Sequence, residues 1–150
     1  MAYDISTTIE IAATPENVWA VLADLASYPQ WHPMYQAVTG QLTAGSTLTI
    51  TSTHPTNGRT VTAKVKVLTA EPDAELRWVS KLLGRTISER EFRLSSTADG
   101  TSLVQTGTYH GLGGGRGRAI TKVVGRIQDS FVAINEAIKQ QAEARQRASD

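Results

Sequence analysis

The stretch that decides the fold is GRAITKVVGRIQDSFVAINEAIKQQAEARQR, residues 117–147, in the last third of the chain. At 100° per residue its apolar side chains fall in one stripe, whereas Lys122, Asp129 and Glu136 fall on the opposite side. This pattern predicts one long amphipathic helix that lies on an apolar surface. The stripe consists of Ile120, Val123, Val124, Ile127, Phe131, Ile134 and Ile138.

The length of this helix sets an expectation for both of its ends. About 28 residues at 1.5 Å each give about 42 Å, which is longer than a typical small domain is wide. We therefore expect the final turns, from Gln140 to Asp150, to overhang the domain or to fray. Before the helix, residues 111–117 read GLGGGRG, which predicts a flexible hinge between the last strand and the helix.

The residues upstream predict the surface that the helix covers. Alternation from Tyr3 to Ala12 indicates a half-buried strand. Thr14 and Pro15 mark the start of a short helix, and Asp24–Trp31 contains a second one. From residue 34 to residue 110 the period is two, interrupted by turn residues, which predicts about six hairpin-linked strands. This order is that of an α+β fold, an antiparallel sheet of about seven strands wrapped against the long helix.

Composition and charge bound the class of protein. A chain of 150 residues is expected to form one domain, residues 1–150, and it contains no cysteine for disulfides or thiol catalysis. The net charge is +1 with scattered lysine and arginine, so we expect no nucleic-acid partner. No apolar run approaches the roughly 20 residues that span a bilayer, and the N-terminus lacks a signal pattern, so the expected location is the cytoplasm.

Three local patterns cover most of the chain and carry a family resemblance. They are IEIAATPENVW (9–19) with Asp24 and YPQWHP (28–33), then ELRW (75–78), then FRL (92–94) with DGTSL (99–103) and YHG (109–111). In this order they resemble the START-like or SRPBCC superfamily, which includes polyketide cyclases, plant pollen allergens and lipid-transfer domains. The resemblance implies a helix-grip fold with a curved sheet, and a cavity between sheet and long helix that typically holds an apolar ligand. Fold alone does not determine function, because these residues mainly build the scaffold.

Polar residues break the apolar pattern of two faces that are expected to point inward. Arg90 shares its face with Phe92 and Leu94, and Gln105 shares the inward face of the last strand with Tyr109. An unpaired charge in an apolar wall is costly, so such residues either orient a ligand or meet a partner within the protein. For Arg90 the alternatives to ligand binding are snorkelling to water and pairing with a carboxylate.

Aromatic residues are expected to form core or cavity wall. His32 lies between Trp31 and Pro33 at an expected cavity entrance, where it either contacts the ligand or has a structural role. The candidate ligand-binding residues are Arg90, Gln105, Tyr109, Trp31, His32, Trp78 and Phe92.

No motif in the chain indicates a metal or a cofactor. His-Glu-x-x-His and Gly-x-Ser-x-Gly are absent, and the glycine segment 111–117 fits neither a dinucleotide-binding nor a phosphate-binding motif. We therefore expect neither a metal nor a cofactor, and no residue is assigned a catalytic role.

Three functions remain open, and the sequence favours the first. It is the binding or transport of a small apolar ligand, lipid-like or aromatic and polyketide-like. The second is an enzyme of the polyketide cyclase or aromatase type, in which polar groups of the cavity move protons. The lack of an internal carboxylate suited to act as a general base argues against it. The third is a protein interaction module.

Overall fold

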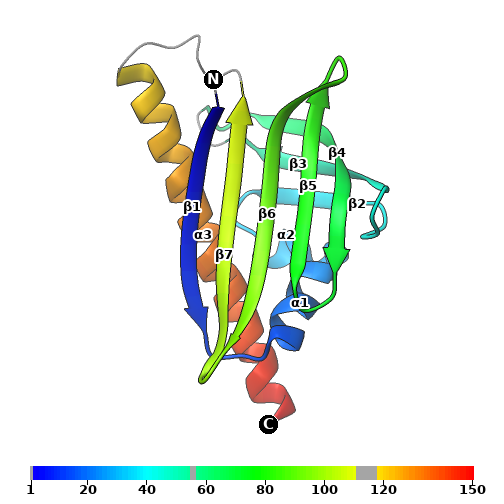
Figure 1. The fold of residues 1–150 in the computed structure, drawn as a ribbon, viewed down its shortest axis with the longest axis vertical. Helices are drawn as coiled ribbons and strands as arrows, with labels where there is room; N and C mark the ends of the chain where they lie inside the picture. The colour runs from blue at the N-terminus through cyan, green and yellow to red at the C-terminus, as the bar shows by residue number, and fades with distance from the viewer. Residues whose placement is uncertain (1, 55–56, 111–117) are drawn as a thin grey trace.

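The computed structural model describes residues 2–54, 57–110 and 118–150, and it has the predicted α+β architecture (Figure 1). Strands, two short helices and a long C-terminal helix follow one another in the expected order. The glycine hinge expected at residues 111–117 lies outside the described residues, as does the side chain of Ile120. The elements are β1 (Ala2–Ile11), α1 (Pro15–Ala23), the 3-10 turn η1 (Leu25–Ser27), α2 (Tyr28–Trp31), β2 (Tyr35–Thr39), β3 (Thr47–Thr53), β4 (Thr60–Glu71), β5 (Glu75–Leu82), β6 (Arg85–Thr97), β7 (Gly100–His110) and α3 (Arg118–Ser149).

The seven strands form one antiparallel sheet in the order β1-β7-β6-β5-β4-β3-β2. Each strand from β2 to β6 pairs with the next strand along the chain, and β1 lies at the far edge against β7. Figure 1 shows this sheet curving around α3. The concave face of the sheet and the long helix therefore enclose the core, which is the helix-grip arrangement.

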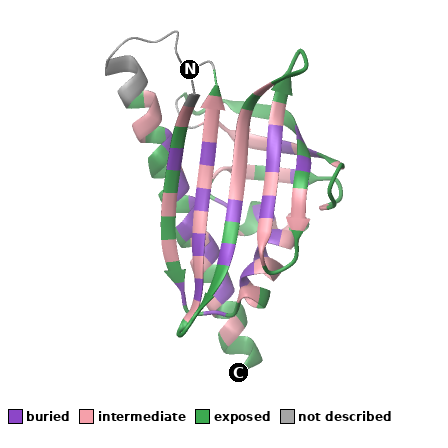
Figure 2. Cartoon of the chain, viewed as in Figure 1, coloured by how far each residue is buried: buried purple, intermediate pink, exposed green. Residues whose placement is uncertain are grey.

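Burial alternates along the strands as the sequence pattern predicts (Figure 2). Trp78, Phe92 and Leu103 are buried on the concave face, whereas Lys64 and Arg93 are exposed on the opposite face. A shift of one residue in the pairing would have exchanged the two faces, and Phe92 and Leu94, which the sequence places on the inward face, are both buried.

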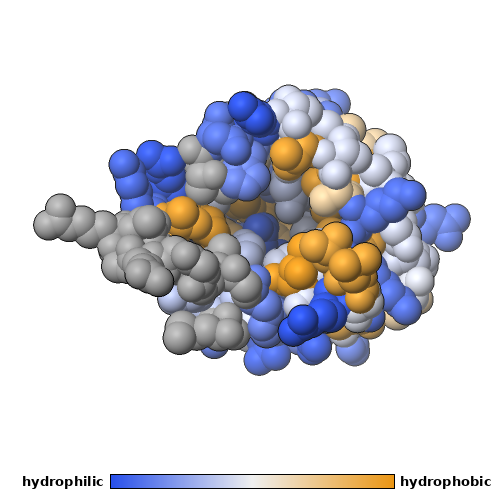
Figure 3. All heavy atoms as spheres, turned by 90° about the horizontal axis from the view of Figure 1, so that it is seen from above, coloured by the Kyte–Doolittle hydropathy of each residue, from blue (hydrophilic) through white to orange (hydrophobic). Residues whose placement is uncertain are grey.

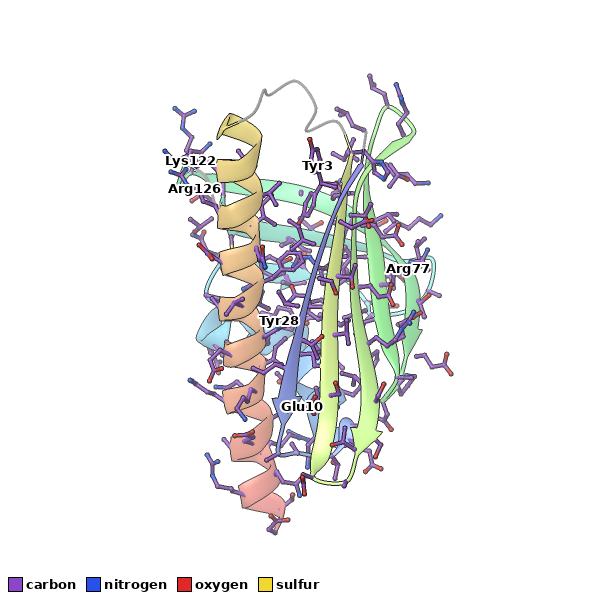
Figure 4. All side chains as sticks on the ribbon, turned by 60° about the vertical axis from the view of Figure 1, so that its left-hand side comes forward. Tyr3, Glu10, Tyr28, Arg77, Lys122 and Arg126 are labelled. Carbon is purple, nitrogen blue, oxygen red and sulfur yellow. The ribbon has the colours of Figure 1, made fainter. Side chains whose placement is uncertain are left out.

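The helix α3 buries the later part of the predicted stripe, leaves Val123 and Val124 half-buried, and exposes the predicted polar side. Lys122 and Arg126 point away from the sheet in Figure 4, and Val132, on the flank of the stripe, is 54% exposed. None of the described helices is long and apolar enough to cross a membrane. The buried members of the stripe are Ile127, Phe131, Ile134 and Ile138.

The predicted overhang of residues 140–150 is wrong for most of that segment. The carboxylate of Glu143 accepts a hydrogen bond from the backbone N of Ala12 at 2.8 Å. The Oε1 of Gln146 accepts one from the backbone N of Thr14 at 3.1 Å. The last turns of α3 therefore hold the connection between β1 and α1.

The reason for this difference is the length of the sheet. The strand β6 contains 13 residues, and at about 3.3 Å per residue a strand of that length spans about 43 Å. The 32 residues of α3 span about 48 Å at 1.5 Å each, so the sheet gives the helix a surface to lie on along most of its length. Ala142, in the segment expected to overhang, is fully buried.

Candidate ligand-binding cavity

A cavity of about 320 Å³ lies between α3 and the concave face of the sheet. The helix supplies apolar wall through Val123, Ile127 and Ile134, and the strands β6 and β7 supply Arg90 and Tyr109. Figure 3 looks at the end of the molecule where α3 begins and shows a hollow with hydrophobic atoms around its rim. The cavity thus combines an apolar wall with a small polar group.

A smaller cavity of about 150 Å³ lies on the same face of the sheet and is lined in part by Trp78. Four side chains border both cavities and therefore stand between the larger space and the smaller one. This group, which we call the polar partition, consists of Tyr35, Ser52, Arg90 and Tyr109.

Arg90 is the charged centre of the polar partition. Its guanidinium donates hydrogen bonds to Gln105 Oε1 and to the Tyr109 hydroxyl, both at 3.3 Å. It also lies 4.3 Å from the centroid of the Phe131 ring, within range of a cation–π interaction. Burial acts to lower the pKa of Arg90, but the phenols of Tyr35 and Tyr109 outweigh it and the pKa is raised. Among the described residues no carboxylate lies within ion-pair distance of this guanidinium.

Gln105 extends the network from Arg90 into the core. It is fully buried, and its Nε2 donates to Asn135 Oδ1 at 2.6 Å and to the Phe131 carbonyl at 3.3 Å. Asn135 Nδ2 in turn donates to Thr7 Oγ1 at 2.8 Å. Because Gln105 Nε2 has two acceptors, its Oε1 faces the guanidinium. Gln105 therefore supports Arg90 from behind and borders neither cavity.

A glycine on β7 makes room for this arrangement. Gly107 pairs with Arg90 across β6 and β7, and a Cβ at position 107 would lie 2.5 Å from Phe131 Cζ. The bare backbone lets the Phe131 ring approach the sheet and lie beside the guanidinium. Any larger residue at position 107 would push the ring and the helix away.

The predicted aromatic wall residues fall into two places. Trp78 lines the smaller cavity opposite Arg90 in the register of β5 and β6, and Phe92 is buried against it with ring centroids 5.8 Å apart. Trp31 is half-buried against Tyr28, with ring centroids 4.8 Å apart, and borders neither cavity. The structure therefore brings Trp78 to the polar partition and leaves Trp31 with the short helices.

His32 is buried, and the expected position at a cavity entrance is wrong. It is 7% exposed, and its Nδ1 accepts hydrogen bonds from the backbone N of Met34 at 3.1 Å and of Tyr35 at 3.0 Å. Its ring stacks on the Tyr35 ring with centroids 3.8 Å apart. Burial, and then the charge of Arg90, lower the pKa of His32 to about 3. The neutral imidazole thus holds the start of β2 and the Tyr35 side chain in place.

This burial predicts a pH dependence of stability. The folded protein keeps His32 neutral, while the unfolded chain protonates it near its ordinary pKa, so stability is full above about pH 6.5 and falls toward pH 3. Between about pH 7 and pH 5.5 we expect a loss of about 1 kcal/mol from this group. Urea denaturation of the wild type and of His32→Asn at both pH values measures it. An equal loss in both proteins would show that another group is responsible.

Sequence reasoning missed Tyr35 and Asn135. The pairing of β2 with β3 shifts between Tyr35 and Ala37, so alternation does not report which way Tyr35 points. Asn135 does carry a signal, because it lies four residues after Phe131 and a helix places it on the same side. A polar residue at that position is buried only when its hydrogen bonds are satisfied, as they are here.

The chemistry available at the polar partition is that of one cation and two phenols. Arg90 can donate to an anionic or carbonyl oxygen, and Tyr109 can add a hydrogen bond to the same atom. Burial raises the pKa of Tyr35, although the nearby Arg90 opposes this, so its phenol keeps its proton at neutral pH. Within the described residues no group of histidines, aspartates and glutamates is placed to hold a metal ion. The arrangement can hold and orient an oxygen atom of a ligand.

Comparisons with known proteins agree with this architecture. The chain is similar to the Zhui aromatase/cyclase from Streptomyces sp. R1128, with 21% identity and a TM-score of 0.77 over 99% of this chain and 98% of that one. It is similar to the di-domain aromatase/cyclase StfQ of the steffimycin biosynthetic pathway, with 14% identity and a TM-score of 0.79 over 97% and 52%. A START superfamily protein from Mycobacterium smegmatis matches with 16% identity and a TM-score of 0.68 over 98% and 99%. No curated protein sequence matches the chain.

At these identities the solved structures show the fold alone, and the family follows from the sequence match. The family model described as polyketide cyclase / dehydrase and lipid transport matches residues 2–143, which is most of the chain. The START-like resemblance of the sequence is thereby confirmed. The chain belongs to the polyketide cyclase / dehydrase and lipid transport family.

Proposed function

We propose that this protein binds one small, largely apolar molecule that carries an anionic or carbonyl oxygen at one end. The observation that carries the proposal is Arg90, a guanidinium at an apolar cavity without a carboxylate partner among the described residues. A charge in such a place is costly unless it is paired, and a ligand oxygen supplies the missing partner. Membership of a family that includes lipid transport proteins supports the same reading.

The walls indicate how such a ligand lies. Its apolar body packs against Val123, Ile127 and Ile134 of α3, and its polar end meets Arg90 and Tyr109. The volume of about 320 Å³ lies at the lower end of the range of about 300–1,000 Å³ for small-molecule sites. A compact aromatic acid or a short acyl chain fits this description better than a membrane lipid with two chains.

A matched pair of fluorescent probes tests the proposal. Anilinonaphthalene sulfonate is apolar with one anionic group, and N-phenylnaphthylamine is the same aromatic body without it. We expect the sulfonate to bind more tightly and to be displaced by fatty acids or aromatic acids. If neither probe enters the protein, the ligand-binding proposal fails and a protein interaction module becomes the better reading.

Tyr109→Phe isolates the contribution of the phenol. The change keeps the volume of the side chain and removes only the hydroxyl, which lies 3.3 Å from the Arg90 guanidinium. We expect affinity for the anionic probe to fall by about 0.5–1.5 kcal/mol, because one hydrogen bond from an uncharged donor is lost. Titration of the probe into both proteins measures it. Equal affinities would mean that the ligand does not use this hydroxyl.

A polyketide cyclase or aromatase activity is the second candidate, and Tyr35 is the observation that favours it. A protonated phenol beside Arg90 can give a proton to a carbonyl oxygen, while the guanidinium stabilises an enolate. An intramolecular aldol reaction would then join the enol carbon to the carbonyl carbon: the carbonyl oxygen takes the Tyr35 proton and the enol O–H returns one to the Tyr35 phenolate. Loss of the new hydroxyl with a hydrogen of the adjacent carbon would release water. Incubation with a linear poly-β-ketone tests this. The activity is excluded if the wild-type protein converts this substrate no faster than buffer alone and no faster than the Tyr35→Phe variant does.

A further inference from the structure

The hairpin between β5 and β6 ends in an exposed apolar tip. Leu82 pairs with Arg85, so the loop consists of two residues, Leu83 and Gly84. Leu83 is 94% exposed and Leu82 is 62% exposed, and these are the two largest exposures among the exposed large hydrophobic residues of the described chain. Apolar side chains of this size at the end of a protruding hairpin have nothing of their own fold to pack on.

The backbone at the tip does not favour a leucine. Leu83 has φ 52 and Gly84 has φ 78, both in the left-handed region. A two-residue hairpin loop of this kind favours asparagine or aspartate followed by glycine, and a bulky residue with positive φ is an outlier. The turn alone would be more stable with asparagine at position 83. The leucine therefore has no structural reason at this site, which points to a contact outside the chain.

The charges beside the tip are of one sign. Lys81 and Arg85 flank the two leucines, both are exposed, and residues 80–88 contain no acidic side chain. Figure 1 places the hairpin at the same end of the molecule as the first turns of α3, which line the larger cavity. The hydrophobic tip, its basic flanks and the end of the helix that lines the cavity thus face the same way.

We propose that this tip, Leu82 and Leu83 with Lys81 and Arg85, docks the protein on the surface of an anionic lipid membrane. Two leucines can enter the apolar edge of a bilayer while the basic side chains remain at the level of anionic headgroups. The protein does not cross the membrane but lies on it, with the cavity end toward the lipid. The docking does not depend on the identity of the cavity ligand.

Two other occupants fit the tip less well. A second copy of the chain, docked tip to tip, would bring Lys81 and Arg85 of both copies together, which is a repulsive arrangement. A stable contact with another protein needs about 800 Å² on each partner, and a projecting two-residue tip supplies far less. A lipid surface needs only insertion of the apolar side chains and attraction of the basic ones.

Leu83→Asn separates a role in docking from a role in the fold. Asparagine suits the left-handed backbone, so the thermal unfolding temperature should stay the same or rise. Binding to phosphatidylcholine vesicles that contain phosphatidylglycerol, measured by sedimentation, should fall at least about tenfold, because one exposed leucine no longer enters the bilayer. Val132→Asn is the control, since Val132 is an exposed apolar residue on α3. It should leave vesicle binding unchanged.

Charge reversal tests the basic flanks. Lys81→Glu with Arg85→Glu should lower binding to the anionic vesicles by at least about fivefold for each residue. Lys64→Glu with Lys66→Glu, on exposed positions of β4, should have a much smaller effect. Absence of wild-type binding to anionic vesicles, or an equal loss with Val132→Asn, overturns the proposal. A dimer in light scattering that Leu83→Asn dissociates also overturns it, in favour of self-association. If the membrane-docking proposal fails in these experiments, the probe titrations of the cavity still test the ligand-binding proposal independently.

Discussion

Replacing Phe131 by alanine is expected to lower the free energy of unfolding by about 3–5 kcal/mol. The ring is fully buried and joins Ile5 and Ile127 in a core cluster between α3 and the edge of the sheet. It also fills the space that Gly107 leaves open and lies beside the Arg90 guanidinium. Alanine would leave a void that these rigid neighbours fill only in part, and the cation–π contact would be lost.

A urea denaturation series with Val132→Ala as the partner variant measures this effect. Val132 follows Phe131 directly but is 54% exposed, so its truncation should change stability by about 0.5 kcal/mol or less. Equal losses in the two variants would contradict the assigned burial of the helix faces. A loss below about 3 kcal/mol for Phe131→Ala would indicate that the cavity wall collapses into the vacated space.

Replacing Arg90 by methionine is expected to produce the largest loss of ligand affinity. Methionine keeps an extended apolar side chain but removes the charge and both of the hydrogen bonds that the guanidinium donates. A hydrogen bond to a charged group contributes about 1.5–3 kcal/mol, so affinity for anilinonaphthalene sulfonate should fall roughly 10- to 150-fold. The fold should persist, because an apolar group replaces a partly buried charge that has no carboxylate partner among the described residues.

Two controls make this result specific. Binding of N-phenylnaphthylamine, which has no sulfonate, should change little in Arg90→Met. Arg93→Met removes an arginine of the same strand from the opposite, exposed face and should leave the affinity for both probes unchanged. An equal loss for both probes in Arg90→Met would mean that the variant has altered the cavity, and that Arg90 does not select the anion.

The inward direction of Arg90, Gln105 and Tyr109 could be predicted from the sequence because strands have a strict period of two. Phe92 on β6 and Leu103 on β7 are apolar and buried. Every second residue along each strand lies on the same face as that buried residue. Alternation does not report distance along the face, however. It could not distinguish Gln105, which lies behind Arg90, from Tyr109, which borders both cavities.

The positions of His32 and Tyr35 could not be predicted in the same way, because neither residue lies in a segment with a regular helical or strand pattern. The helix α2 has only four residues, too few for a helical pattern, and the shift after Tyr35 breaks the strand pattern. What determines their position is hydrogen bonding of the His32 ring to the next backbone amides. Such local hydrogen bonds from backbone to side chain depend on turn geometry and produce no periodic pattern of residues in the sequence.

The place of β1 at the edge of the sheet has a consequence for the synthesis of the chain. Ser6 lies opposite Thr106, 100 positions later, and α3 follows after that. At about 5–20 residues per second, roughly 5–20 s pass between synthesis of β1 and synthesis of its partner strand. The hairpins from β3 to β7 can form as they emerge, because each strand pairs with the one just made. The strand β1 is made before the other six strands and is among the last of them to be placed.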